Sequence, residues 1–510
     1  MYKPEIPLQI RNFGPIARGE IHLRPFSIFV GPSNSGKSYL AAFIYALHSY
    51  FGGRLRPGVM GPVPFQGRGV EALNHILATQ EQFITALEAA TLSEWANRTF
   101  NNSDVAVQEG RHHRILIPER FLTHVNRLNR AFGERFHREL AYCTGINDAT
   151  RFQRVNSTLP TQISIRPATK QPGQGNLSQL DFRLEDGVWV IESVPTDGES
   201  EFELALDSKE YRFFREKTSQ LKATSADRFK LAAEEFIVRI AEHILKKHLS
   251  PFGHKSYYFP AARNGATILY KTLIGEAIRR RDTREGSHLF PGTISDLLSI
   301  LLDVGNAVSD PIRPGKAEIT SMENNVLEGS FEIDSNILYG LHEFKYKPKG
   351  ETVLFPLQDV ASMVSTLAPI ALCVRYLAKP DSTLIIEEPE AHMHPQKQVE
   401  LTRELAYLVN TGIHVVITTH SEWILEELTN IVKRSATYGH QRNSTSVTDG
   451  ALEESQVGVW HFRRLKNRNT TEIVRAVRNP TGLYETGYDE VARDLYQDWV
   501  RMEEMQGESH

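Results

Sequence analysis

The sequence predicts an α/β protein, because three short apolar segments end in polar residues and two of them lead directly into helical patterns. The first is "FSIFV" at 26–30, which is followed by a glycine-rich loop and an apolar helix that begins near Lys37. The second is "TLIIEE" at 383–388, and the third is "IHVVIT" at 413–418, which precedes a helix capped by Ser421.

Composition restricts the class of protein. The chain has 510 residues, of which 40% are hydrophobic and 24% are charged, enough for about two to four domains. No apolar stretch reaches the roughly 18 residues of a membrane span and no secretion signal opens the chain, so we expect a cytoplasmic protein without a membrane partner. Cys143 and Cys373 are too few for a disulfide framework or a cysteine zinc site.

A net charge of -4 neither requires nor excludes a nucleic-acid partner. The basic stretches "RFFREK" at 212–217 and "AIRRRDTR" at 277–284 are candidates for DNA or RNA contact. They are equally read as solvated helix faces.

The stretch "GPSNSGKS" matches the P-loop pattern at each fixed position: Gly31, Gly36, Lys37 and Ser38. The glycines let backbone N–H groups curl around phosphate oxygens, and Lys37 supplies a cation to the β and γ phosphates. The Ser38 hydroxyl is a ligand for Mg²⁺. The pattern therefore predicts an ATP site, and the loop residues that also belong to it are Asn34 and Ser35.

A hydrolytic P-loop site also needs an acidic strand end for Mg²⁺ and a group that activates water. Glu387 and Glu388 end the second apolar segment. We assign Glu387 to the Mg²⁺ shell and Glu388 to the attacking water, because adjacent residues can serve different partners where a strand ends and turns. His420 ends the third segment, where a sensor of the γ phosphate would lie; a structural histidine is the alternative.

The same region, "LIIEEPEAHMHP", admits two other interpretations. His392 and His394 with the glutamates could bind zinc, but the spacing is i and i+2 rather than the i and i+4 of a helical zinc motif. Pro389 and Pro395 favour a turn instead. The segment could also be a buried strand with an acidic end.

Together these motifs resemble the ABC-type ATPases of the SMC, RecF and OLD branch. "GPSNSGKS" resembles Walker A, "LIIEE" Walker B, "PEAHMHP" the D-loop region and "ITTHS" the switch-histidine loop. The resemblance implies an ABC-type P-loop ATPase head that uses ATP and Mg²⁺ and pairs with a second head as a homodimer or higher homo-oligomer.

In that family a distant signature segment completes the active site across the dimer. "LQDVASMVSTLAPIALCVRYL" at 357–377 resembles it, with Ser362 in the place of the signature serine. Met363 departs from the usual glycine, and an ordinary amphipathic helix is the alternative. The opening "LQIRNFGPIARGEIHLRPFSIFVG" at 8–31 resembles the family's first hairpin, which implies that Arg11, Asn12 and Phe13 lie near the nucleotide. "YYFPAARNG" at 257–265 resembles a strand end of OLD-like ATPases, which implies a phosphate-side role for Arg263.

The motifs divide the chain into four parts. The ATPase head comprises 1–50 and 255–440, with a mixed helical and β insertion at 51–254 and a C-terminal hairpin and helix at 441–510. Within the insertion, 70–145 has helical periodicity, 160–206 alternates as strands around "PGQGN", and "RFKLAAEEFIVRIAEHILKKHL" predicts a long helix. No sustained heptads predict a long coiled-coil arm.

Two functions fit these features. The first is a nucleotide-driven switch that controls a separate effector, such as a nuclease or toxin, as the resemblance to bacterial antiviral-defence ATPases implies. The alternative is a DNA-repair or recombination ATPase that acts on duplex DNA or its ends. A scaffold without hydrolysis is the third. The roughly 90 residues after His420 are too few for a Toprim nuclease domain, and Asp489, Asp494 and Asp498 are read as an exposed helix face.

Overall fold

A computed structural model describes residues 5–52, 84–101, 107–109, 112–155, 157–166, 178–195, 201–222, 226–280, 292–309, 320–338, 341–438, 451–465, 470–478, 484 and 488–507. The chain forms two compact units. Unit 1 comprises Met1, Leu23–Tyr45 and Lys255–His510, and unit 2 comprises Tyr2–His22 and Ala46–His254. The opening hairpin thus groups with unit 2, whereas the four-part division above remains a prediction.

Unit 1 contains a mainly parallel sheet, which confirms the predicted α/β class. Its strand order is β10, β14, β15, β3, β16 and β17, with the first five parallel and β17 antiparallel to β16. Strands β3, β10 and β14 are buried along their whole length, as expected for a parallel sheet covered on both faces. The strands are β3 (Phe26–Val30), β10 (Ser256–Phe259), β14 (Thr383–Glu387), β15 (His414–Thr419), β16 (Val457–Arg464) and β17 (Thr471–Arg475).

The order of these strands positions the site. β15 lies between β14 and β3, with Glu387 opposite Thr418 and Thr419 opposite Val30. Parallel strands end at the same edge of a sheet, so the residues that follow Val30, Glu387 and Thr419 meet there.

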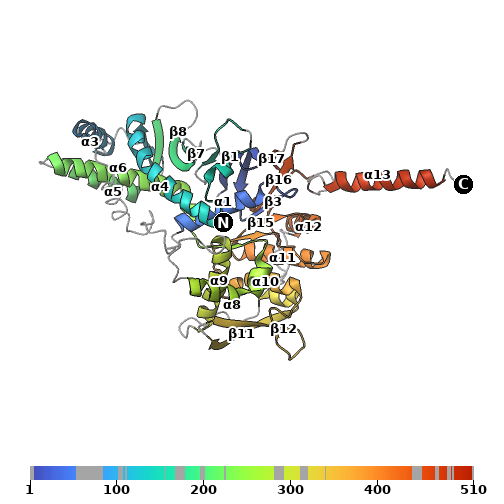
Figure 1. Ribbon diagram of the computed structural model, residues 1–510. Coiled ribbons are helices and arrows are strands. Elements are labelled where there is room, and N and C mark those ends of the chain that lie inside the picture. Colours follow the sequence, from blue (N-terminus) through green and yellow to red (C-terminus); the bar gives the residue numbers. More distant parts are fainter. Residues whose placement is uncertain are drawn as a thin grey trace. The chain divides into compact units, whose positions relative to one another are not determined.

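Helices α7 to α12 of unit 1 pack apolar side chains into one core with these strands. α9 and α10 pack against each other, as do α11 and α12 (Figure 1). Ser421 Oγ accepts a hydrogen bond from Ile424 N at 3.2 Å, which confirms the predicted cap of α12. The helices are α1 (Lys37–Phe51, in unit 1 as far as Tyr45), α7 (Arg263–Ile268), α8 (Tyr270–Arg280), α9 (Gly292–Ser309), α10 (Ser362–Tyr376), α11 (Pro395–Asn410), α12 (Glu422–Tyr438) and α13 (Tyr488–Gly507).

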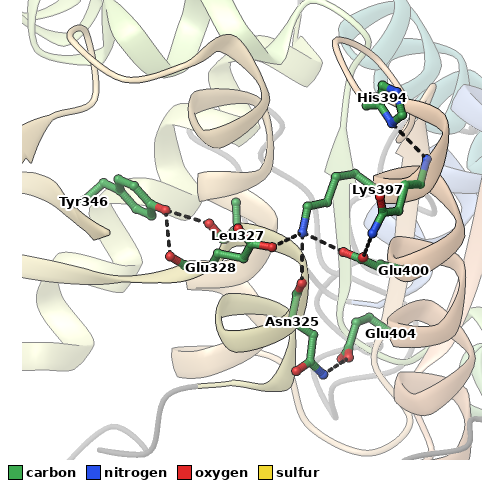
Figure 2. Close-up of polar contacts among 9 residues, drawn as sticks. Asn325, Leu327, Glu328, Tyr346, His394, Lys397, Glu400 and Glu404 are labelled. Carbon is green, nitrogen blue, oxygen red and sulfur yellow. Dashed lines mark hydrogen bonds and ion pairs between the residues drawn. The ribbon is translucent and has the colours of Figure 1, made fainter. Parts of the chain in front are cut away.

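A second sheet of unit 1 consists of β11 (Gly329–Leu338), β12 (Leu341–Pro348) and β13 (Phe355–Pro356), and follows the π-helix η4 (Met322–Leu327). Figure 2 shows how α11 holds the end of η4: Lys397 Nζ donates to Asn325 O at 3.3 Å and pairs with Glu328 Oε1 at 2.7 Å. Asn325 Nδ2 donates to Glu404 Oε1 at 2.7 Å. At the other end of η4, buried Glu323 pairs with Arg375 of α10 at 3.1 Å.

Unit 2 contains further strands and helices. The strands β1 (Ile6–Phe13), β6 (Gln162–Ile165), β7 (Ser178–Glu185) and β8 (Val188–Pro195) pair antiparallel in that order, and β2 (Ile16–Leu23) neighbours β1. Phe13, Phe152 and Trp189 form a buried aromatic cluster beside this sheet. The other elements are α3 (Ala86–Asn101), β4 (Val107–Glu109), β5 (His112–Pro118), α4 (Glu119–Thr144), η1 (Ala149–Phe152), β9 (Glu201–Asp207), α5 (Ser208–Thr218), η2 (Ser219–Lys222), α6 (Ala226–Leu249) and η3 (Ser250–Phe252).

The expectations for 51–254 are met in part. The strands at 160–206 and the long helix α6 form as predicted, and "RFFREK" lies on α5. The helical pattern at 70–145 is interrupted by β4 and β5, which pair with each other, and β5 also pairs with β9. Strand β5, "HHRILIP", is apolar at its centre, and this pairing overrides the surrounding helical periodicity. "PGQGN" and the end of "AIRRRDTR" fall outside the described residues.

No helix in the described ranges is long and apolar enough to span a bilayer.

Candidate nucleotide-binding site

The P-loop connects β3 to α1 in unit 1. Its backbone takes left-handed values at Asn34 (φ 59°) and Gly36 (φ 98°), and φ is 148° at Gly31. A Cβ atom on Gly31 would lie 2.6 Å from the carbonyl oxygen of Phe462 on β16, so only glycine fits there. The loop shape that the sequence predicts is therefore set by the neighbouring strand as well as by the glycines.

Lys37 is buried at the start of α1, and its Nζ donates to the carbonyl oxygens of Gly31 and Pro32, both at 2.8 Å. Burial lowers the pKa of Lys37 to about 8, and Glu388, Glu390 and Glu387 oppose that shift. The ammonium is thus held in place by the carbonyls of its own loop.

The hydroxyl groups of this loop differ in their surroundings. Ser35 Oγ is buried and has no hydrogen-bond partner among the described residues. Ser38 is exposed on the first turn of α1, a position from which its hydroxyl can reach a metal ion. The first turn of a helix also offers backbone N–H groups without intrahelical partners. An unpartnered hydroxyl, free N–H groups and a buried cation together fit a phosphate group.

Glu387 ends β14 with 8% of its surface exposed, and both of its oxygens accept hydrogen bonds. Tyr258 donates its hydroxyl to Oε1 at 2.9 Å, and the backbone N–H of Ala261 donates to Oε2 at 3.0 Å. Tyr258 lies on β10, the strand that pairs with β14, and Ala261 comes directly after that strand. The carboxylate is therefore fixed in orientation and keeps one lone pair on each oxygen for a metal-bound water.

Glu388 follows in a left-handed conformation, with φ 43°. Its N–H donates to Thr418 O at 2.9 Å, and its carboxylate is 44% exposed. This backbone turn directs the two glutamates differently, as expected at a strand end. Glu388 Oε1 lies 3.5 Å from Nε2 of His420, whose ring is 31% exposed.

The imidazole of His420 is kept neutral by its surroundings. Burial lowers the pKa of His420, the charge of Lys37 lowers it further, and Glu388 partly opposes both. A neutral ring can present one donor and one acceptor to the groups around it.

Arg263 is fully buried behind this turn. Its Nε donates to Thr366 O at 3.1 Å, its Nη1 to the carbonyls of Pro260 and Glu387, and its Nη2 to Glu388 O at 2.9 Å. Burial lowers the pKa of Arg263 to about 10, against the nearby glutamates. All three nitrogens thus serve backbone carbonyls, and the phosphate-side role stays a prediction. In the structure the guanidinium ties α10 to the end of β14.

Ser362 is the first residue of α10 and is exposed, as a residue that contacts a second head would have to be. Met363 packs partly against the core. One turn later, Ser365 Oγ donates to Asn264 Oδ1 at 2.6 Å.

Arg11 and Asn12 lie on β1 in unit 2. Asn12 has φ 51°, accepts a hydrogen bond from Ser157 Oγ at 3.3 Å and donates to Pro160 O at 3.3 Å. These contacts give Asn12 a structural part in its own unit. Its nucleotide role stays a prediction, as does that of Arg11.

His392 and His394, the two histidines of the zinc hypothesis, lie in the turn before α11. His394 caps α11 by accepting a hydrogen bond from Gln396 N at 3.3 Å, and exposed His392 occupies a left-handed turn position with φ 65°. Across the described ranges, no group of three or more His, Cys, Asp or Glu side chains could hold a metal ion.

Sequence reasoning missed two residues that hold the site together. From the sequence alone, Tyr258 is only a residue of an apolar strand, and Glu390 of "EEPE" has no assigned role. A third acidic residue so close to a strand end is a signal from which a role for Glu390 in the site could have been predicted. The position of Tyr258 required knowledge that β10 pairs with β14.

Comparison with known protein families gives a match that covers several of these site residues. Residues 208–425 match the family model of the AAA ATPase domain. The matched range contains Arg263, Ser362, Glu387, Glu388 and His420, whereas the P-loop precedes it. A comparison with curated proteins gives no match.

Among solved structures, three SMC head domains are similar at low levels. The SMC head bound to the C-terminal winged-helix domain of ScpA has 9% identity and a TM-score of 0.33, over 93% of this chain and 97% of that one. The head from Thermotoga maritima has 8% identity and a TM-score of 0.32, over 93% and 100%. The Pyrococcus furiosus head, with an extended coiled coil and bound to the C-terminal domain of ScpA, has 10% identity and a TM-score of 0.32, over 97% and 99%. Similarity at this level does not decide function.

Proposed function

We propose that the chain is an ABC-type ATPase that converts ATP and water to ADP and phosphate with Mg²⁺. The observation that carries this proposal is the pairing of Glu388 Oε1 with His420 Nε2 at 3.5 Å beside the P-loop lysine. Lys37 interacts electrostatically with both residues. A phosphate-binding cation, an exposed carboxylate and a neutral imidazole therefore share one edge of the parallel sheet.

Each group has a part in the reaction. The P-loop N–H groups and Lys37 bind the phosphates, which must replace the carbonyls of Gly31 and Pro32 as partners of the ammonium. Glu388 polarises the attacking water with its exposed carboxylate. His420 orients the γ phosphate from the next strand, and its contact with Glu388 links phosphate position to water activation.

Ser38 and Glu387 would hold Mg²⁺, Ser38 through its hydroxyl and Glu387 through a bound water. The oriented carboxylate and the hydroxyl are oxygen donors of the kind that Mg²⁺ prefers. The ion, when bound, neutralises phosphate charge.

At the level of the cell, we propose a nucleotide-driven switch in the cytoplasm, in which paired heads control a separate nuclease or toxin effector in anti-phage defence. The exposed position of Ser362 at the start of α10 supports head pairing. Unit 2, with the three-stranded sheet of β4, β5 and β9, further strands and several helices, supports a role in transmitting the change to a protein partner. The alternative is a repair or recombination ATPase that acts on duplex DNA.

The test is phosphate release by the purified chain, with nucleotide binding measured in parallel. We expect turnover that requires Mg²⁺ or Mn²⁺, and we expect Lys37→Ala to lose ATP affinity because the phosphate cation is removed. Unchanged ATP affinity in Lys37→Ala would contradict the P-loop assignment. Turnover that rises several-fold with duplex DNA would favour the repair alternative over the switch.

A further inference from the structure

The third carboxylate of "EEPE", Glu390, is directed at the residues that end β15. Its Oε1 accepts a hydrogen bond from Thr419 Oγ1 at 2.7 Å and another from the backbone N–H of His420 at 2.7 Å. Thr419 Oγ1 in turn accepts from Ser421 N at 3.0 Å. A single oxygen of Glu390 therefore holds, through two hydrogen bonds, the backbone turn to which the imidazole of His420 is attached.

Glu390 is itself held by the turn after β14. Its carbonyl oxygen accepts from Met393 N at 3.1 Å, and Ala391 N donates to Glu388 O at 3.1 Å. Arg263 donates to the same Glu388 carbonyl. The carboxylate thus projects from a rigid frame, and the frame includes the peptide of Glu388.

The remaining oxygen of Glu390, Oε2, is buried and has no hydrogen-bond partner among the described residues. Burial raises the pKa of Glu390, and the charge of Glu388 adds to that effect, against the hydrogen bonds from His420 and Thr419. A carboxamide has the shape of a carboxyl group and keeps one carbonyl oxygen, which can accept both contacts. Both contacts go to one oxygen, so their geometry requires an acceptor of the right length, which a carboxamide also provides.

We propose that Glu390 is a positioning residue that sets the distance between the His420 imidazole and Glu388 by holding the Thr419–His420 backbone. This inference rests on the proposed ATPase function. It assigns neighbouring glutamates opposite requirements: Glu388 needs its charge to polarise water, whereas Glu390 needs only its acceptor oxygen.

Three variants of Glu390 separate these requirements. Glu390→Gln keeps the acceptor and should retain kcat within about 3-fold. Glu390→Asp withdraws the acceptor by one methylene, and Glu390→Ala removes it, so both should lower kcat about 10-fold to 100-fold with little change in ATP affinity. Glu390→Gln with the low turnover of Glu390→Ala would overturn the proposal, since the charge would then be the essential property. Wild-type turnover in Glu390→Ala would overturn it as well.

A double variant tests whether Glu390 acts through His420. If it does, Glu390→Ala should lower kcat by less than about 2-fold in a His420→Ala background, because the positioned group is already missing. Full additivity of the two losses would refute the route through His420. Thermal unfolding of each variant identifies a loss that comes only from misfolding, which would also refute it.

Hydrogen exchange provides a measurement that does not depend on turnover. The His420 amide donates to Glu390, so exchange in a peptide covering 417–424 should be faster in Glu390→Ala and near wild type in Glu390→Gln. Unchanged exchange in Glu390→Ala would overturn the inference. A wild type that does not hydrolyse ATP would refute the proposed function, while the exchange experiment would still decide whether Glu390 holds the turn.

Discussion

The hydroxyl of Tyr258 donates to Oε1 of Glu387 at 2.9 Å, across two adjacent parallel strands. This hydrogen bond orients the carboxylate assigned to Mg²⁺. Partners of this kind typically contribute about 10-fold to 100-fold in metal affinity or activity.

Tyr258→Phe should therefore raise the Mg²⁺ concentration needed for half-maximal turnover, by about 10-fold, because Glu387 loses a donor that fixes its orientation. The measurement is a Mg²⁺ titration of phosphate release at saturating ATP. Tyr257→Phe is the matched control, since its hydroxyl is also buried but donates to Leu377 O at 3.0 Å, away from the carboxylates. Equal Mg²⁺ requirements for both variants would argue against a metal role for Glu387.

Glu388→Gln should bind ATP and block turnover by at least about 100-fold, because the amide keeps the shape of the side chain but cannot polarise water. Phosphate release and nucleotide retention are measured on the same sample. Hydrolysis at the wild-type rate would move the water-activating role to another residue.

The acid limb of kcat/KM should depend on His420. Its pKa is lowered in the folded protein, so the ring stays neutral at pH 7 and gains a proton only as the pH falls below its ordinary value of 6.5. The imidazolium would pair with Glu388 and draw the carboxylate away from water, so kcat/KM should fall toward lower pH. His420→Asn should lower activity and remove this acid limb. An unchanged acid limb in His420→Asn would assign the titration to another group.

Ser362 should act in a site of the neighbouring head. Ser362→Arg alone should abolish turnover, because the bulky side chain blocks the approach of the γ phosphate to the start of α10. Mixing Lys37→Ala chains with Ser362→Arg chains should partly restore activity, since one composite site in the heterodimer is intact. Wild-type hydrolysis by Ser362→Arg would refute the signature assignment.

Head pairing itself can be observed without turnover. ATP should increase the particle size of the Glu388→Gln chain in light scattering, because nucleotide is retained and pairing is linked to its binding. A size unaffected by ATP, together with an inactive mixture, would place Ser362 in its own head.

Arg263→Met should lower the free energy of unfolding by about 3 kcal/mol, because four backbone carbonyls each lose one donor in a buried environment. Arg263→Lys should recover only part of this loss, since one ammonium group replaces three nitrogens. Chemical denaturation measures both variants. Arg501→Lys is the control, because that side chain is 69% exposed on α13 and should change stability by less than about 0.5 kcal/mol. Wild-type stability in Arg263→Met would contradict the tie between α10 and β14.

The sequence was sufficient to predict the α/β class and the strand-end positions of Glu388 and His420, because apolar periodicity marks strand ends. It could not show that β15 lies between β14 and β3, since strand order depends on contacts between distant segments. For the same reason the partners of Glu387, Glu390 and Arg263 were not predicted: each is supplied by another strand or helix. Residue type indicated the chemistry, and only the fold showed which atoms each group contacts.

The contact between Gly31 and Phe462 has a consequence for the timing of assembly. β3 is made near the start of synthesis, but its two neighbours, β15 and β16, end at Thr419 and Arg464. The two strands beside the phosphate loop are therefore available only after most of the chain has left the ribosome. Pairing between strands so far apart in the sequence is slow. A nascent or truncated chain that ends before Val457 has the P-loop sequence without the strand that shapes it. We therefore expect the proposed nucleotide binding to arise only after β16 has been synthesised.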